Sequence, residues 1–147
     1  MERAGNANEG GGSITAFYTV LTEGDDNNDP IADAARGVLD GHIVLSRSLA
    51  EAGHFPAIDI EASVSRVMTD IVDTGHLKMA REVRRLYSLY QQNRDLISVG
   101  AYQPGSDPRI DQAIEKNAAI VDFLQQDMDE PVDINRSLHE LETLLAV

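Results

Sequence analysis

The residues that could do chemistry in this chain are charged side chains and histidines, since the sequence contains no cysteine. Disulfides, thiolate metal sites and thiol catalysis are therefore excluded. The histidines show no metal-ligand spacing such as His-x-x-x-His, so we interpret all of them as structural: His42, His54, His76 and His139. The run at residues 10–12 (GGG) is not a phosphate-binding loop, because no lysine and hydroxyl residue follow it.

Charge is distributed unevenly along the chain, whose formal net charge is −13. This balance disfavours nucleic-acid binding, which depends on neutralising phosphates. The basic side chains near Glu82 gather in one stretch: Lys78, Arg81, Arg84, Arg85 and Arg94. An acidic block lies further along: Asp122, Asp127, Asp129, Glu130 and Asp133. The two stretches are either solvated surfaces or surfaces that face partners or neighbouring subunits.

The elements that position these residues divide the chain into a sheet-bearing part and a helical part. Residues 1–12 are polar and glycine-rich and predict a flexible lead-in. Residues 14–21 are rich in β-branched and aromatic residues and predict a strand. A helix over 31–40, capped by Asp29 with Pro30 in its first turn, precedes a second strand over 42–46. This order predicts a parallel strand–helix–strand unit with a right-handed crossover.

Residues from about 69 onward carry apolar side chains at helical spacing. A short helix over 49–53 and an extended segment at 55–59 come before them, since Pro56 disfavours helix at its predecessor. Asp107 with Pro108, and Asp133, are expected helix starts. Three apolar stripes are predicted: Met79, Val83, Leu86 or Tyr87, and Tyr90; then Ile110, Ile114, Ala118, Val121 and Leu124; then Ile134, Leu138, Leu141 and Leu145.

Several blocks in order carry a resemblance to a known family. They are residues 12–21 (GSITAFYTVL), 24–26 (GDD), 29–33 (DPIAD), 39–47 (LDGHIVLSR), 54–59 (HFPAID) and 63–66 (SVSR). Together they resemble the ATPases of the rotary ATP synthase superfamily, and 32–33 with 39–42 resemble its protein-export branch. Residues 92–102 (QNRDLISVGAY) and 105–108 (GSDP) resemble the flagellum-specific export ATPases.

The resemblance implies a fold class of α/β followed by all-α. Residues 13–68 would be the C-terminal portion of a RecA-like P-loop ATPase core, and 69–147 a C-terminal helical bundle. The family's phosphate-binding loop, magnesium-binding aspartate and catalytic glutamate would lie upstream, so we expect a C-terminal fragment. ATP and Mg²⁺ would be bound by the full-length enzyme, and neither would be held by this chain alone.

The resemblance also assigns roles to individual residues. Arg66 would be the arginine finger that a subunit supplies to its neighbour's active site. Phe55 would contact adenine, with Phe123 and Met128 closing the other side of that pocket. From the residues alone, a solvated or ion-paired side chain explains Arg66 better than a finger does, and helix packing explains Phe123 and Met128 at least as well as a pocket.

Two loops would face partners by the same resemblance. Asp25, Asp26 and Asn27 would face the central channel of a hexameric ring, although their composition also fits a solvated turn before a helix cap. Tyr102 and Gly105 would lie in a lever that faces the stalk. The implied partners are other copies of the chain, a coiled-coil stalk, and export chaperones and apparatus. The implied place is cytoplasmic, peripheral to the inner membrane at the flagellar base.

Two rival interpretations remain open at this point. The chain could be a helical module that binds a stalk, chaperone or cargo protein without nucleotide. It could also belong to the sister branch that serves virulence-type injection, although the 92–100 block favours the flagellar branch.

Overall fold

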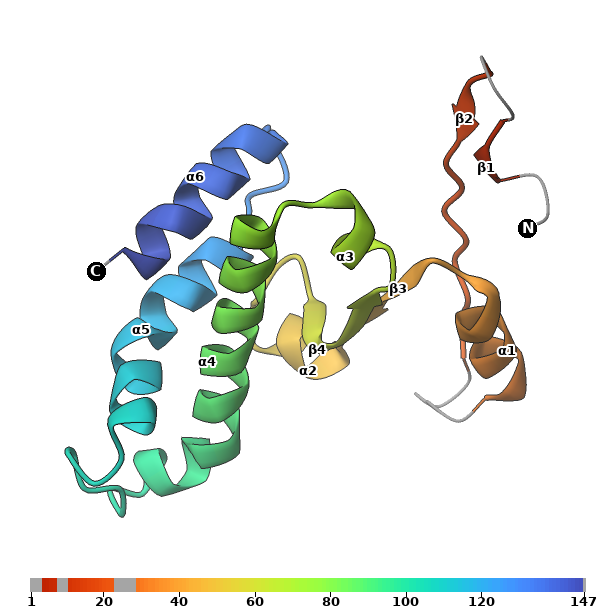
Figure 1. Cartoon of the computed structure of the whole chain (residues 1–147). Helices are drawn as coiled ribbons and strands as arrows, with labels where there is room; N and C mark the ends of the chain where they lie inside the picture. Colours follow the sequence, from red (N-terminus) through yellow and green to blue (C-terminus); the bar gives the residue numbers. More distant parts are fainter. Residues whose placement is uncertain (1–3, 8–10, 23–28, 147) are drawn as a thin grey trace. The chain divides into compact units, whose positions relative to one another are not determined.

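The computed structural model describes residues 4–7, 11–22 and 29–146, which fall into two compact units, 1–39 and 40–147. Figure 1 shows the first unit in red to orange and the second in orange through yellow and green to blue. No helix among the described residues is long and apolar enough to cross a membrane.

The first unit contains a short antiparallel pair and one helix. Strand β1 (Gly5–Asn6) pairs with β2 (Ser13–Ile14), so the expected lead-in contains a strand. Helix α1 (Pro30–Val38) begins as the sequence predicts, because Asp29 Oδ1 accepts hydrogen bonds from the Ile31 and Ala32 amides, both at 2.9 Å. Ala32 and Ala35 form the buried side of α1.

The predicted parallel strand–helix–strand unit is wrong. The expected strand over 14–21 is limited to Ser13–Ile14, and β3 (Gly41–Leu45) pairs with a later strand in the antiparallel direction. β-Branched and aromatic residues indicate a preference for a pleated, packed surface, but they do not identify the partner strand. The sequence prediction therefore placed β3 correctly and gave it the wrong neighbour.

The partner of β3 is β4 (Ile58–Ser65), where the sequence predicted only an extended segment at 55–59. The register runs from Gly41 opposite Ser65 to Leu45 opposite Ile58, with an irregularity between His42 and Val44. Gly41 is required there, because an added Cβ would clash with the carbonyl oxygen of Val64. Two short helices flank this ladder, α2 (Arg47–Glu51) and α3 (Met68–Ile71).

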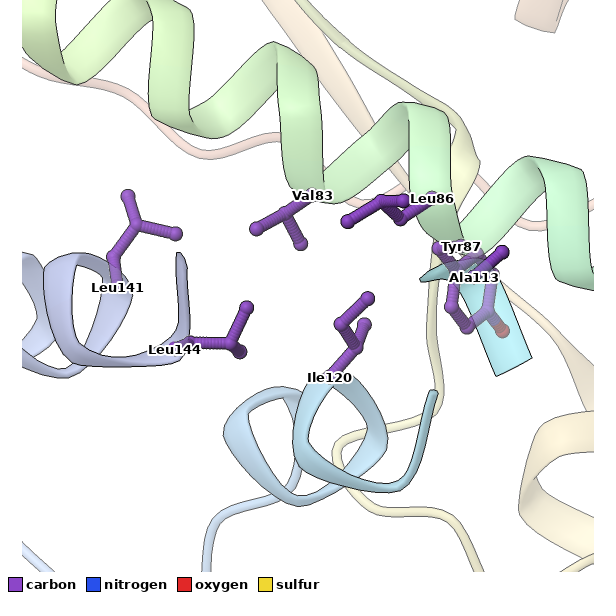
Figure 2. Packing of buried hydrophobic residues seen from close by; sticks show 7 residues of the cluster. All are labelled: Val83, Leu86, Tyr87, Ala113, Ile120, Leu141 and Leu144. Carbon is purple, nitrogen blue, oxygen red and sulfur yellow. The ribbon is translucent and has the colours of Figure 1, made fainter. Parts of the chain in front are cut away.

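Three helices form the remaining part of the second unit: α4 (Thr74–Ser98), α5 (Pro108–Leu124) and α6 (Ile134–Leu145). The predicted caps are confirmed, since Asp107 and Asp133 side chains accept hydrogen bonds from the first turns of α5 and α6. Figure 2 shows the apolar side chains that these helices turn toward one another. The cluster consists of Val83, Leu86, Tyr87, Ala113, Ile120, Leu141 and Leu144.

The predicted stripe of α4 is confirmed, but that of α5 is displaced around the helix. Its buried residues are Ala113, Lys116 and Ile120. Lys116 is 7% exposed, and its Nζ donates to the Leu144 carbonyl oxygen at 2.9 Å. The ammonium group thus satisfies a carbonyl at the C-terminal end of α6, where the helix has none of its own donors left. A lysine at a core position hides the stripe from an analysis that counts only apolar residues.

Candidate functional site

Arg66 follows the last residue of β4, at a bend before α3. Its backbone N–H donates to the Asp40 carbonyl oxygen at 2.8 Å. This hydrogen bond extends the ladder one step beyond the Gly41–Ser65 pair. The backbone of Arg66 is therefore fixed by the sheet, while the residue itself is exposed.

The strand that carries Arg66 is held by side chains at its irregular middle. Ser63 Oγ accepts a hydrogen bond from the Val44 amide at 2.9 Å and donates to the Asp59 carbonyl oxygen at 2.5 Å. From α4, the Arg84 guanidinium donates to the carbonyl oxygens of Ser63 and Glu61. Arg84, one of the basic stretch, thereby connects α4 to β4, the strand that immediately precedes Arg66.

A second region is an open cleft of about 910 Å³ within the 40–147 unit. Phe55 and Phe123, predicted from opposite sides of an adenine pocket, both line it. Phe55 is 56% exposed, so its ring is accessible to a ligand. Met128 is 98% exposed and is not among the lining residues, so the structure does not bring it together with the two phenylalanines.

Residues 125–130 connect the two sides of this cleft. The Gln126 N–H donates to the Phe55 carbonyl oxygen at 3.1 Å, and Gln125 Nε2 lies 3.4 Å from Nδ1 of the buried His54. Gln126 Nε2 in turn donates to the Glu130 carbonyl oxygen at 2.6 Å. The segment that carries Phe55 is thus bonded to the loop that follows α5.

Arg136 on α6 completes the border of the cleft. Its guanidinium donates to Glu130 Oε1 at 2.5 Å and to Glu140 Oε1 at 2.7 Å. These hydrogen bonds, first that with Glu140 and then that with Glu130, raise the pKa of Arg136 above its ordinary value. Part of the acidic block is therefore paired with a base from the neighbouring helix.

The turn between α4 and α5 contains Tyr102 and Gly105 and is organised around one carboxylate. The Tyr102 hydroxyl donates to Asp111 Oδ1 at 2.8 Å, and the Gly105 N–H donates to Asp111 Oδ2 at 2.9 Å. Gly105 has φ +87°, a backbone conformation that residues with a Cβ rarely adopt. These hydrogen bonds give the turn a defined shape.

The third predicted group, Asp25, Asp26 and Asn27, lies outside the described residues. Among the residues that the structure does describe, no group of three or more histidine, aspartate or glutamate side chains could hold a metal ion.

Two family models divide the chain between them. Residues 1–65 match the nucleotide-binding domain of the ATP synthase alpha/beta family, and residues 72–143 match the C-terminal domain of the type III secretion ATPase EscN. The flagellum-specific ATP synthase of Pseudomonas aeruginosa is 62% identical over 99% of this chain. The chain belongs to the family of flagellum-specific and type III secretion ATPases.

Solved structures of export ATPases in this family have the same fold. The assembled ATPase EscN of enteropathogenic Escherichia coli matches 97% of the chain with a TM-score of 0.93 and 47% identity. EscN in complex with its central stalk EscO matches 98% with a TM-score of 0.87 and 44% identity. The chain spans about a third of each relative, 32% of the Pseudomonas protein and 34% and 33% of the two EscN chains.

Sequence reasoning missed several residues that organise the candidate site. Arg136 and Glu140 have the i, i+4 spacing of a helical ion pair, which was a readable signal. Asp111 lies four residues after the cap Asp107, but its hydrogen bonds return to the preceding turn, which spacing does not reveal. Gln126 bonds through its backbone N–H to Phe55 and through its side-chain amide to the Glu130 carbonyl oxygen, and neither contact is visible as a spacing pattern.

Proposed function

We propose that this chain is the C-terminal part of a ring-forming ATPase that couples ATP hydrolysis to flagellar protein export. In the complete protein, Arg66 of one subunit acts on ATP bound by its neighbour. The observation that carries this proposal is the placement of Arg66: a strand fixes its backbone, and the residue is exposed. Family membership and the assembled state named for EscN support it.

The chemistry asked of Arg66 is electrostatic. Charge spreads over the oxygens of the transferring phosphoryl group, and a positioned guanidinium stabilises that charge with planar paired donors. The bonds that hold β4, from Asp40 and Arg84, fix the origin of the Arg66 side chain before ATP arrives. Such preorganisation reduces the reorganisation needed at the reaction. The metal-assisted steps belong to residues that this chain does not supply.

In the same proposal, the adenine base of ATP binds in the cleft. Phe55 presents an accessible ring and Phe123 borders the same cleft, so a purine could stack on an aromatic face there. Met128 does not line the cleft, although Asp127 and Glu130 do, so a contribution from its side chain requires a different arrangement of residues 125–133.

The partners follow from the same family. The turn that contains Tyr102 and Gly105 contacts a central coiled-coil stalk, with Asp25, Asp26 and Asn27 facing the ring's channel. EscN, whose structure was solved with its central stalk EscO, supports a partner of this kind. Export chaperones, a hexameric ring and a cytoplasmic place beside the inner membrane at the flagellar base complete the proposal. The virulence-type export system is the alternative, since relatives from both systems match.

The test is Arg66→Ala in the complete protein. A finger acts on the transition state, so kcat should fall by roughly three to five powers of ten while ATP affinity changes little. Arg66→Lys should recover little activity, because lysine lacks the planar fork of donors. Steady-state kinetics and equilibrium binding of a nonhydrolysable ATP analogue measure the two effects separately.

Arg109→Ala is the matched control, since it removes an exposed arginine from an ion pair at the far end of the bundle. It should leave kcat unchanged. If Arg66→Ala lowers the melting temperature and ring assembly without a selective loss of kcat, Arg66 is a structural residue and the finger assignment is wrong.

A further inference from the structure

We propose that Gln126 and Arg136 are positioning residues for nucleotide recognition: they hold the segment that carries Phe55 at the edge of the cleft. The inference rests on the proposed adenine site and adds to it the residues that determine where its aromatic wall lies. None of these residues needs to touch the base.

The first step is the contact at Phe55 itself. The ring is exposed, so packing by itself leaves it room to move, and its position depends on the backbone that carries it. That backbone is bonded to residues 125–126: the Gln126 N–H donates to the Phe55 carbonyl oxygen, and Gln125 Nε2 lies within 3.4 Å of His54 Nδ1. His54 is buried, so this pair anchors the segment on its inner side.

The second step fixes residues 125–126 in turn. Gln126 Nε2 donates to the Glu130 carbonyl oxygen at 2.6 Å, and the Glu130 N–H donates to the Asp127 carbonyl oxygen at 3.1 Å. These bonds close residues 126–130 into a compact turn. Its shape therefore determines where the Gln126 N–H points.

The third step connects that turn to the helical core. Arg136 binds Glu130 on the turn and Glu140 one helical turn further along α6. Helix α6 is anchored by Leu141 and Leu144 in the shared core. A continuous series of bonds thus runs from the core through α6, Arg136 and the 126–130 turn to Phe55.

An arginine shared by two carboxylates suits this role better than a single surface ion pair. An isolated exposed pair contributes little, because solvent screens it and holding both side chains costs entropy. Here one planar guanidinium satisfies two acceptors with separate nitrogens, Nε and Nη2. Lysine has a single donor centre and cannot reproduce both geometries.

The experiment uses the complete ring-forming protein and measures kcat, the KM for ATP, and inhibition by ADP and by inorganic pyrophosphate. Arg136→Ala and Gln126→Met should raise the KM for ATP and the inhibition constant of ADP by about two- to tenfold, the range that one aromatic contact is worth. The inhibition constant of pyrophosphate, which has no base, should not change, and kcat should stay within about twofold. Arg136→Lys should behave like Arg136→Ala.

Two variants make the outcomes distinguishable. Arg109→Ala, which breaks an ion pair outside the cleft, should leave all four quantities unchanged. Phe55→Ala should raise the KM for ATP and the inhibition constant of ADP, and it should leave the inhibition constant of pyrophosphate unchanged. If Phe55→Ala raises the KM for ATP and the inhibition constant of ADP while Arg136→Ala and Gln126→Met leave both unchanged, the positioning role is wrong and the adenine site stands. If Phe55→Ala changes neither the KM for ATP nor the inhibition constant of ADP, the adenine site is wrong, and the positioning role that depends on it is wrong too.

A third outcome also overturns the inference. If Arg136→Ala and Gln126→Met raise the inhibition constant of pyrophosphate as much as that of ADP, the two substitutions cause a general loss of structure. Gln126→Met nearly keeps the side-chain volume and removes the amide group that binds the Glu130 carbonyl oxygen, so it remains informative if Arg136→Ala fails to fold.

Discussion

Aspartate side chains cap the N-termini of α1, α4, α5 and α6, and the carboxylate of Asp107 also binds an arginine side chain. Its carboxylate accepts hydrogen bonds from the Arg109 guanidinium and from the Arg109 N–H at the start of α5. These bonds, the side-chain one first, lower the pKa of Asp107 from 3.8 to about 2. The charged form is therefore the form that the folded state favours.

The consequence is a stability contribution that depends on pH. Because the folded pKa is lowered, the contribution is complete above the unfolded value of 3.8 and disappears as pH falls toward about 2. Titration of the Asp107 carboxyl carbon by NMR should give a midpoint near 2. In Arg109→Ala the midpoint should rise toward 3.8; an unchanged midpoint would show that the guanidinium is not the cause.

At the scale of single residues, the sequence predicted the helix caps, because a cap depends only on residues that are close together in the chain. The caps Asp29, Asp107 and Asp133 follow from a carboxylate placed before an amphipathic segment, and all three bind the expected amides. The cleft depends on residues from 53 to 144 meeting in space. No local pattern could show that Phe55 and Phe123 share a cleft while Met128 does not line it.

Among the elements, α4 carries the packing that holds the second unit together. Leu86 is fully buried on the side that faces α5 and α6, whereas Leu96, ten residues further along the same helix, is 51% exposed. The two leucines therefore form a matched pair with the same chemistry and opposite burial. Removal of a buried leucine leaves a cavity in addition to the lost transfer energy.

Leu86→Ala should lower the free energy of unfolding by about 2–5 kcal/mol, and Leu96→Ala by at most about 0.5 kcal/mol. Urea denaturation followed by circular dichroism measures both. Equal effects from the two substitutions would contradict the core assignment on α4.

The elements also show where pattern reasoning loses accuracy. The stripe on α5 was displaced because Lys116 occupies a core position, and its charge satisfies a helix end that only the three-dimensional structure reveals. Strand β4 was missed because its middle, residues 60–63, departs from a regular ladder and is stabilised by Ser63 and Asp59 side chains. The helical part was easier, since its periodicity is local.

For the whole molecule, ATP hydrolysis requires a phosphate-binding loop and metal ligands in addition to the residues of this chain. The sequence has no Gly-Lys-Ser/Thr loop, and the described residues offer no metal cluster. The purified 147-residue chain should therefore show no ATP hydrolysis above background in the presence of Mg²⁺. Turnover that disappears on mutation of a residue within this chain would refute that expectation.

The central claim is that Arg66 acts across a subunit boundary, and mixed rings test it most directly. Complete subunits with Arg66→Ala keep their own phosphate-binding loop, whereas subunits with a defective loop keep Arg66. Each preparation alone should be inactive. Mixtures should regain ATPase activity, because some interfaces then pair an intact loop with an intact Arg66 from the neighbour. If rings assemble at every mixing ratio and none regains activity, Arg66 does not act in trans.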